Sequence, residues 1–433
     1  MKLRLLPILL SITVALFVSA CTENKNDPAT SSTTSITKFS LKSIKVPTLN
    51  KTVFTIDNVT STIYNVDSLP YLSDIDSLIP TIYGATLSSV YINDTLLYSG
   101  KDTLDFTKTV TLKSTATDKT STQTYVVKVN VHQVNPDLYL WEGVKSEIYQ
   151  GATTQQKAIL FNNKLTLLVK TTTDIKLYES FNGEAWTESA VTGLPFASDL
   201  NGLTATKDEI VLLHEQDLYS STNGKIWSKK TSSAVQLHRL LFYMNEKCYA
   251  LGSIDGTNTV IFQSEDYITW ENLGVIPEKF PITGFGVCVD AAPSGKMRAF
   301  LIGGKDSSGN LLSSVWSTEN GSYWANLTAE KAWFPAREYA SVVQYGEALM
   351  LIGGSNGTET LTDKQWLSTD YGLTWKVANE QTKLPDLCIP RFGQSVLIDQ
   401  ENYIYIVGGQ TSSTFLRDVW KGRKNSSIPG FLN

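Results

Sequence analysis

The feature that most constrains the fold is a short motif that recurs in the second half of the chain. Each copy has an aromatic residue, Ser or Thr two positions later, then Asn or Asp, a nearby Gly, and a Trp on the far side. STDYGLTW, residues 368–375, is the fullest copy. The leading aromatics lie 41 to 54 residues apart, at Tyr178, Tyr219, Phe262, Trp316 and Trp366, with Trp420 as a sixth aromatic outside any full copy. Self-similarity at this period, in a chain of short alternating segments, predicts the blades of a β-propeller.

The chemistry of the motif is that of a tight turn. Asn-Gly between two alternating runs is a strong hairpin signal, because Gly accepts a positive φ without steric cost. The hydroxyl and the Asn or Asp side chain can satisfy backbone N–H groups inside the turn. We therefore expect structural turns, each with a Trp packed between neighbouring sheets, and the third copy has Ile268 where a Gly is expected. The turn residues are Ser180, Asn182 and Trp186; Ser221, Asn223 and Trp227; Ser264, Asp266 and Trp270; Thr318, Asn320 and Trp324; and Ser368, Asp370 and Trp375.

Two family resemblances support this interpretation. The turn motif is similar to the Asp-box of sialidases and other propellers, which implies a link between the third and fourth strands of a blade, away from any active site. The sequences LIGG at 301–304 and 351–354, and IVGG at 406–409, each followed by an aromatic residue, resemble kelch repeats. This second resemblance covers about residues 238–422 and also implies a propeller.

Six aromatic positions predict six blades. Each of the first five repeats supplies four strands, whereas the last supplies only three, which would leave an exposed sheet edge. The segment LYLWEGV, residues 138–144, is the natural donor of the missing strand. The sequence therefore predicts an all-β protein with a six-bladed propeller over residues 135–433, closed by residues 138–144 beside Trp420.

Residues 38–134 form a separate segment that alternates apolar and polar residues at the spacing of a β-sandwich. The runs VDSLPY and LIPTI, followed by TDKTSTQTYVVKVNV, resemble the Ig-like N-terminal modules of Bacteroidetes surface lipoproteins, which implies a spacer or adhesion-type module. Four Asp-Ser/Thr-Leu triplets, at 67–69, 76–78, 94–96 and 102–104, resemble an O-glycosylation acceptor of that group. Chance matches are an equal alternative in a segment this rich in Ser and Thr.

The N-terminus reads as an export signal. Lys2 and Arg4 precede an apolar run, and small residues precede Cys21, so residues 1–20 are predicted to be a signal peptide. Val-Ser-Ala-Cys resembles the bacterial lipobox, which implies a lipid anchor on Cys21; the alternative is an ordinary signal with an incidental Cys. Residues 21–37 read as a flexible tether. The expected location is the cell envelope, on the cell surface or the periplasmic face of the outer membrane.

Other chemistries find little support in the sequence. The net charge is −5, and the sequence has no run of Lys and Arg residues of the kind that binds a phosphate backbone, which disfavours nucleic acid as a partner. Three scattered histidines, and the isolated Cys248, Cys288 and Cys388, predict neither a metal site nor a disulfide framework. No Ser-His-Asp arrangement or phosphate-binding Gly loop is visible, and no cofactor is expected.

Four residues are candidates for ligand binding. Arg337 and Arg391 follow proline-containing turns, at the expected start of an innermost strand, where a guanidinium could bind a carboxylate in the central channel. Arg239 is a third candidate, and Trp333 lies in the loop before Arg337. The alternatives are that the arginines bond loop carbonyls and that Trp333 covers the edge of its own blade.

The sequence leaves three functions open. The leading hypothesis is a lipid-anchored protein whose propeller binds a glycan or an envelope protein through its loop face. The second is an enzyme similar to sialidases or sialic acid mutarotases, which would require carboxylates and a Tyr to converge on Arg337 and Arg391. The third is a scaffold subunit of an envelope complex.

Overall fold

The computed structural model describes residues 30–292, 294–361 and 365–425. The chain divides into two compact units between Gln133 and Val134, one residue from the predicted boundary. The predicted signal peptide and the predicted lipidation residue Cys21 lie outside the described residues. Within the described residues, no helix has the length and apolar character needed to cross a membrane.

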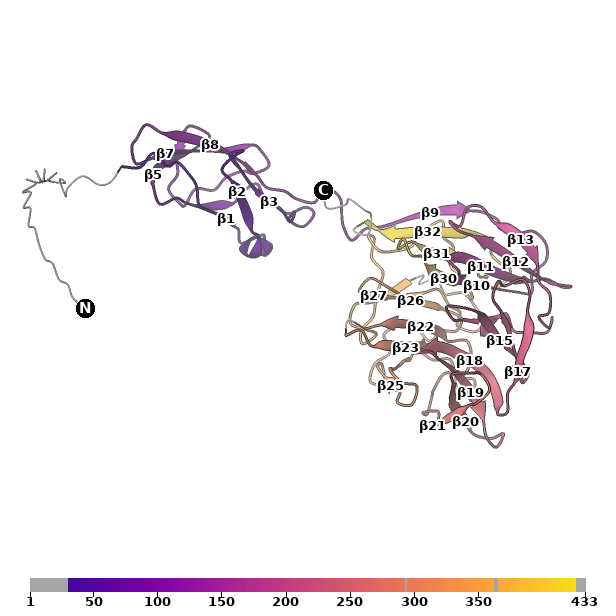
Figure 1. Ribbon diagram of the computed structural model, residues 1–433. Helices are drawn as coiled ribbons and strands as arrows, with labels where there is room; N and C mark the ends of the chain where they lie inside the picture. Colours follow the sequence, from indigo (N-terminus) through magenta and orange to yellow (C-terminus); the bar gives the residue numbers. More distant parts are fainter. Residues whose placement is uncertain (1–29, 293, 362–364, 426–433) are drawn as a thin grey trace, which may run out of the picture. The chain divides into compact units, whose positions relative to one another are not determined.

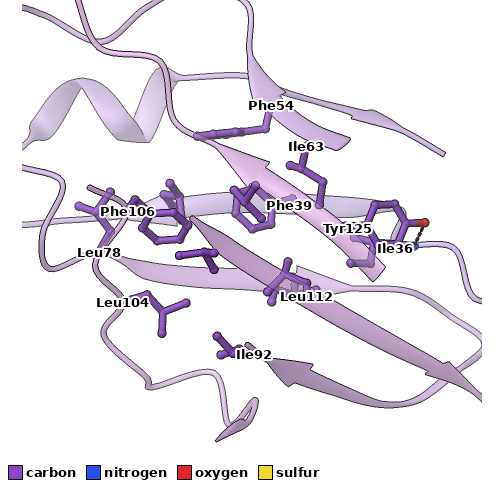
Figure 2. Packing of buried hydrophobic residues seen from close by; sticks show 14 of the residues in the cluster. Ile36, Phe39, Phe54, Ile63, Leu78, Ile92, Leu104, Phe106, Leu112 and Tyr125 are labelled. Atoms are coloured by element: carbon purple, nitrogen blue, oxygen red, sulfur yellow. Dashed lines mark hydrogen bonds between the residues drawn. The ribbon is translucent and has the colours of Figure 1, made fainter. Parts of the chain in front are cut away.

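The first unit contains two sheets that share one hydrophobic core. A six-stranded sheet has the order β2-β3-β8-β7-β5-β6, in which only β3 and β8 pair in parallel, and β1 pairs with β4 in a second sheet. Figure 2 shows side chains of the core, including Phe39 from one sheet and Ile63, Leu112 and Tyr125 from the other. The elements are β1 (Lys38–Lys42), η1 (Pro47–Lys51), β2 (Phe54–Asp57), β3 (Thr62–Asn65), β4 (Ile79–Tyr83), β5 (Leu87–Ile92), β6 (Leu96–Leu97), β7 (Val110–Ala116) and β8 (Thr122–Lys128).

The first unit begins earlier than the sequence suggested. The predicted tether extends to Thr37, yet Ile36 is fully buried and its backbone N–H donates to the Tyr125 hydroxyl at 3.2 Å. The backbone N–H of Ser31 donates to Thr117 Oγ1 at 2.8 Å. Residues 31–37 are therefore part of the unit, and their Ser/Thr-rich composition hid the one apolar side chain that fixes them.

The second unit consists of six four-stranded antiparallel sheets, counted over its described residues. Five are built from consecutive strands, and the sixth has the order β30-β31-β32-β9. The strands are β9 (Tyr139–Lys145), β10 (Gln155–Phe161), β11 (Lys164–Lys170), β12 (Ile175–Ser180), β13 (Thr187–Ala190), β14 (Thr204–Ala205), β15 (Ile210–His214), β16 (Asp217–Ser221), β17 (Ser228–Ser232), β18 (Gln236–Met244), β19 (Lys247–Ser253), β20 (Thr259–Ser264), β21 (Glu271–Val275), β22 (Gly286–Ala291), β23 (Met297–Ile302), β24 (Val315–Thr318), β25 (Ala325–Asn326), β26 (Ser341–Tyr345), β27 (Ala348–Ile352), β28 (Gln365–Ser368), β29 (Lys376–Val377), β30 (Ser395–Ile398), β31 (Ile404–Val407) and β32 (Val419–Lys424), with a short 3-10 helix, η2 (Leu200–Gly202), before β14.

The six sheets form a closed ring. The first strands of neighbouring sheets contact one another in cyclic order, from β10 through β14, β18, β22 and β26 to β30, and β30 contacts β10. Six hydrophobic clusters fill the six gaps between neighbouring sheets. Because the second strands are covered on both faces, they are largely apolar runs, such as the buried Leu165–Val169 in β11, in which Thr166 is the one polar residue.

The ring closes through a strand from the start of the unit. β9 pairs antiparallel with β32 over six residue pairs, including Trp420 opposite Gly143 and Arg423 opposite Leu140. Figure 1 shows β9 (magenta) beside β32 (yellow). The sequence predicted this pairing from the missing fourth strand, and the observed strand is shifted by one residue from the predicted range 138–144.

Candidate functional site

The five Trp turns join the third and fourth strands of the first five sheets and share one set of hydrogen bonds. In the second sheet, Gly224 N–H donates to Ser221 Oγ at 2.9 Å, and Asn223 Oδ1 accepts two backbone N–H groups. The indole Nε1 of Trp227 donates to the Gly224 carbonyl at 2.9 Å. The other four turns repeat the bond to the Ser or Thr hydroxyl and the bond from the Trp indole. In the fifth turn, Asp370 accepts one backbone N–H and the hydroxyl of Thr374.

The third turn differs from the sequence interpretation at one position. Tyr267, not Ile268, occupies the place that Gly fills in the other copies, and it has a φ of 64°. Its N–H donates to Ser264 Oγ at 2.8 Å, as the Gly N–H does elsewhere. Two backbone N–H groups, from Thr269 and then Ile268, hold the pKa of Asp266 at about 2. Backbone hydrogen bonding therefore sets the turn even without Gly.

Each turn is seated on the neighbouring sheet. A Cβ on Gly321 would lie 2.1 Å from the ring of Tyr249 in the preceding sheet, and one on Gly372 would lie 3.1 Å from Val315. Trp375 is 2% exposed and packs against Phe334 with ring centroids 5.6 Å apart. The turns stabilise the ring by packing against neighbouring sheets, and the polar atoms described above form hydrogen bonds inside the turn.

The structure places Arg337 and Arg391 inside the protein. Arg337 is fully buried, and its Nη1 donates to the Gly353 carbonyl at 2.9 Å. Arg391 is 2% exposed and makes the equivalent bond to Gly408, together with a bidentate pair to Asp418 at 2.6 and 2.9 Å. Both guanidinium groups bond carbonyls of the Gly-Gly segment, which is the alternative that the sequence left open. Neither reaches the channel as a ligand-binding group.

Trp333 is half-buried and packs against the cluster between the fourth and fifth sheets. Lys331 Nζ lies 3.8 Å from the centroid of its ring. The adjacent Phe334 is buried in the same cluster. Trp333 therefore covers an edge between sheets, and the structure does not bring it together with Arg239.

The remaining candidates for chemistry are also buried. Cys248, Cys288 and Cys388 are buried, and burial raises the pKa of Cys248 and Cys288 to about 12, which disfavours the reactive thiolate. Among the described residues, no three His, Cys, Asp or Glu side chains are placed to hold a metal ion.

The axis of the ring contains a cavity of 340 Å³, which we call the channel. All six first strands line it, for example Ile159 from β10, Thr204 from β14, Leu241 from β18 and Leu397 from β30. Its volume is within the range of about 300–1,000 Å³ typical of small-molecule sites. Every sheet therefore contributes side chains to the lining of the channel.

Two cations give the channel a positive charge near the start of its strands. Lys157 on β10 and Arg239 on β18 both line it, and Arg239 Nη2 bonds Asp199 at 3.2 Å. Burial, and then the Arg239 guanidinium, lowers the pKa of Lys157. Among the described residues, no hydrogen-bonding partner of the Lys157 ammonium is found. Of the four sequence candidates, Arg239 alone lies in the channel. Sequence reasoning missed Lys157, although a Lys within the apolar run QQKAILF was a possible signal.

A second cavity of 190 Å³ shares Asn201 with the channel and forms what we call the mouth. Its lining includes Gln155, Tyr339, Gln410 and Phe415. Asn201 is fixed by the side chain of Asp199, which accepts its backbone N–H at 3.0 Å. Amide groups and aromatic rings therefore surround the end of the channel where the cations lie.

Two family models match the chain. Residues 135–432 match the DUF6242 beta propeller domain, and residues 23–129 match the N-terminal domain of DUF6242, a domain of unknown function. No curated protein matches the sequence. The ring of four-stranded sheets is thus a β-propeller in an all-β chain.

Proposed function

The chain belongs to the DUF6242 family, and we propose that its propeller binds the acidic group of a glycan at the mouth of the channel. The ring of six sheets supports a count of six blades. The two sheets around one core support an Ig-like spacer in the first unit.

The observation that carries this proposal is the pair Lys157 and Arg239. Both line the channel, and Asp199 bonded to Arg239 is the countercharge beside them. An ammonium in a partly desolvated site without a partner is stabilised by a bound anion. The planar guanidinium of Arg239 can hold a carboxylate or a sulfate through two parallel hydrogen bonds.

The mouth supports a glycan as the carrier of that acidic group. Gln410 offers amide donors and an acceptor that suit hydroxyl groups, whereas the side chain of Gln155 bonds Asp199 and the backbone N–H of Leu200. Tyr339 and Phe415 offer aromatic faces, on which the apolar face of a sugar ring can pack. The sialidase-like or mutarotase-like alternative requires carboxylates and a Tyr to converge on Arg337 and Arg391. Both arginines instead bond backbone carbonyls, those of Gly353 and Gly408.

Attachment to the membrane through Cys21 remains part of the proposal and rests on the sequence. Cys21→Ser should shift the protein from the membrane fraction to the soluble fraction of fractionated cells. Retention of this variant in the membrane fraction would argue against the lipid anchor.

Binding of a carboxylated oligosaccharide tests the site. Titration calorimetry at pH 7 with tetragalacturonate, a sulfated oligosaccharide and a neutral tetrasaccharide should give heat only with an acidic glycan. We expect Lys157→Ala and Arg239→Ala each to weaken binding at least tenfold, because each removes a charge-assisted hydrogen bond. Lys207→Ala, at a surface lysine whose side chain is 84% exposed, is the control and should bind like the wild type.

The pH dependence adds a second readout. Binding requires the charged ammonium of Lys157, and the pKa of this group is lowered. As the pH rises, the ammonium should therefore lose its proton, and the affinity should fall, before the pH reaches the usual lysine pKa of about 10.4. Lys157→Arg should bind with less dependence on pH, since a guanidinium stays charged. Failure of every acidic glycan to bind, or equal binding by Lys157→Ala, would contradict the proposal.

A further inference from the structure

A groove at the Trp turn of the fourth sheet has no role in the channel. It has a volume of 440 Å³, and its lining includes Arg298 from β23, Glu319, Tyr323 and Trp324 from the turn, and Leu327. We call it the rim groove. Strands alternate in direction within each sheet, so the turn between the third and fourth strands lies at the opposite end from the strand starts where Lys157 and Arg239 lie.

Two aromatic residues of the rim groove are held by the turn itself. Asn320 Oδ1 accepts the backbone N–H of Tyr323 at 3.0 Å, and Trp324 Nε1 donates to the Gly321 carbonyl at 2.9 Å. Trp324 also packs edge-on against Phe280, with ring centroids 4.9 Å apart. Tyr323 is 81% exposed, and among the described residues its ring has no aromatic or hydrogen-bonding partner. A fixed backbone thus presents a free aromatic ring to solvent.

The charged residues that line the rim groove, Arg298 and Glu319, balance one another, and Lys296 Nζ, outside the lining, lies 3.9 Å from Glu319 Oε2. Arg298 Nη2 bonds Glu319 Oε1 at 3.1 Å, and the Arg298 guanidinium lies 5.8 Å from the centroid of the Tyr371 ring. The pair supplies both donors and acceptors without a net charge, which suits a hydroxyl-rich neutral ligand better than an anion. This balance distinguishes the rim groove from the channel.

The repeats of the propeller supply internal comparisons. The corresponding turn of the third sheet has a smaller cavity of 220 Å³, lined by polar and charged side chains including Lys247, Glu265 and Glu271 and by no aromatic residue. In the second sheet, Ile226 stands at the position of Tyr323, directly before the Trp, and is 67% exposed. The aromatic ring, the ion pair and the larger volume coincide at the fourth sheet.

We propose that the rim groove binds one or two pyranose units of a neutral glycan. The apolar C–H face of a pyranose packs on the Tyr323 ring, and its hydroxyl groups bond Arg298 and Glu319. This site is separate from the channel and does not depend on its acidic ligand. The protein would then hold a glycan at two places with different chemistry.

Ligand-observed NMR of the full chain with cello-, malto-, xylo- and manno-tetraose tests the rim groove. At least one tetrasaccharide should show saturation transfer, and Tyr323→Ala should weaken its binding at least tenfold. Tyr323→Phe keeps the ring and should bind within about threefold of the wild type. Ile226→Ala, at the matched position of the second sheet, should bind normally.

Three results would overturn this inference: no binding by any tetrasaccharide, equal binding by Tyr323→Ala, or a loss caused by Lys157→Ala instead of Tyr323→Ala. The last result would place the neutral ligand in the channel. Unchanged melting temperatures for the Tyr323 variants, expected from the exposure of this side chain, exclude unfolding as the cause of a loss.

Discussion

Deletion of residues 138–144 should abolish the cooperative unfolding of the propeller. These residues include most of β9, and without them β32 becomes an unpaired edge. The deletion also removes Tyr139, which is 8% exposed and packs against Tyr345 with ring centroids 5.7 Å apart. Each buried aromatic side chain contributes roughly 2 kcal/mol, and total stability is only about 5–15 kcal/mol. Calorimetry should therefore show no propeller transition, and the protein should aggregate.

Two substitutions in the same strand pair test how strongly the packing between β9 and β32 stabilises the propeller. Gly422→Ala would put a Cβ 2.3 Å from the Trp141 ring, so we expect it to destabilise the propeller by about 2 kcal/mol. Gly143→Ala is the matched control, because its Cβ would lie 3.6 Å from Trp420, an ordinary contact. A deletion variant that melts within a few degrees of the wild type would show that β9 does not close the ring.

Gly321→Ala should cost about 3 kcal/mol of stability. Gly321 has a φ of 76°, which costs an Ala roughly 1 kcal/mol, and its Cβ would overlap the buried Tyr249 ring at 2.1 Å. Overpacking of a dense core adds about 1–3 kcal/mol. Urea unfolding followed by tryptophan fluorescence measures the change, which should appear as a lower midpoint with an unchanged slope.

Gly224→Ala separates backbone strain from packing. Gly224 has a φ of 75° in the equivalent turn, but its nearest neighbour, a methyl group of Leu177, would lie 3.3 Å from the new Cβ. This variant should lose only about 1 kcal/mol. Equal losses for the two variants would mean that the turns are stabilised by their own conformation and not by contact with the next sheet.

The sequence predicted the ring because its signals are local. Each signal depends on a few neighbouring residues: the Asn-Gly turn, the Trp that follows it, or an apolar middle strand. The period at which these signals recur indicates the number of blades. The missing fourth strand of the last repeat then implied the pairing of β9 with β32. The position of Tyr267 was misread by one residue, since a side chain in the Gly place gives no local signal.

The site was harder to predict because it depends on which way side chains point. Arg337 and Arg391 follow similar proline-containing turns, but their orientation is set by the carbonyls of Gly353 and Gly408, which come directly after β27 and β31. Lys157 comes from the first sheet and Arg239 from the third, and only the closed ring places both in the channel. The rim groove likewise combines β23 with a turn that the sequence assigned a purely structural role.

A disulfide across the closing strands measures the central claim most directly. Leu140 lies opposite Arg423, and facing Cα atoms of antiparallel strands are about 4.5–5.5 Å apart, within the range of a disulfide. The double variant Leu140→Cys/Arg423→Cys should form this bond on mild oxidation, and mass spectrometry should find the two segments joined. Leu140→Cys/Lys424→Cys, shifted by one residue, should not. Absence of the first link, or equal yields for both pairs, would contradict a ring closed by β9 in this register.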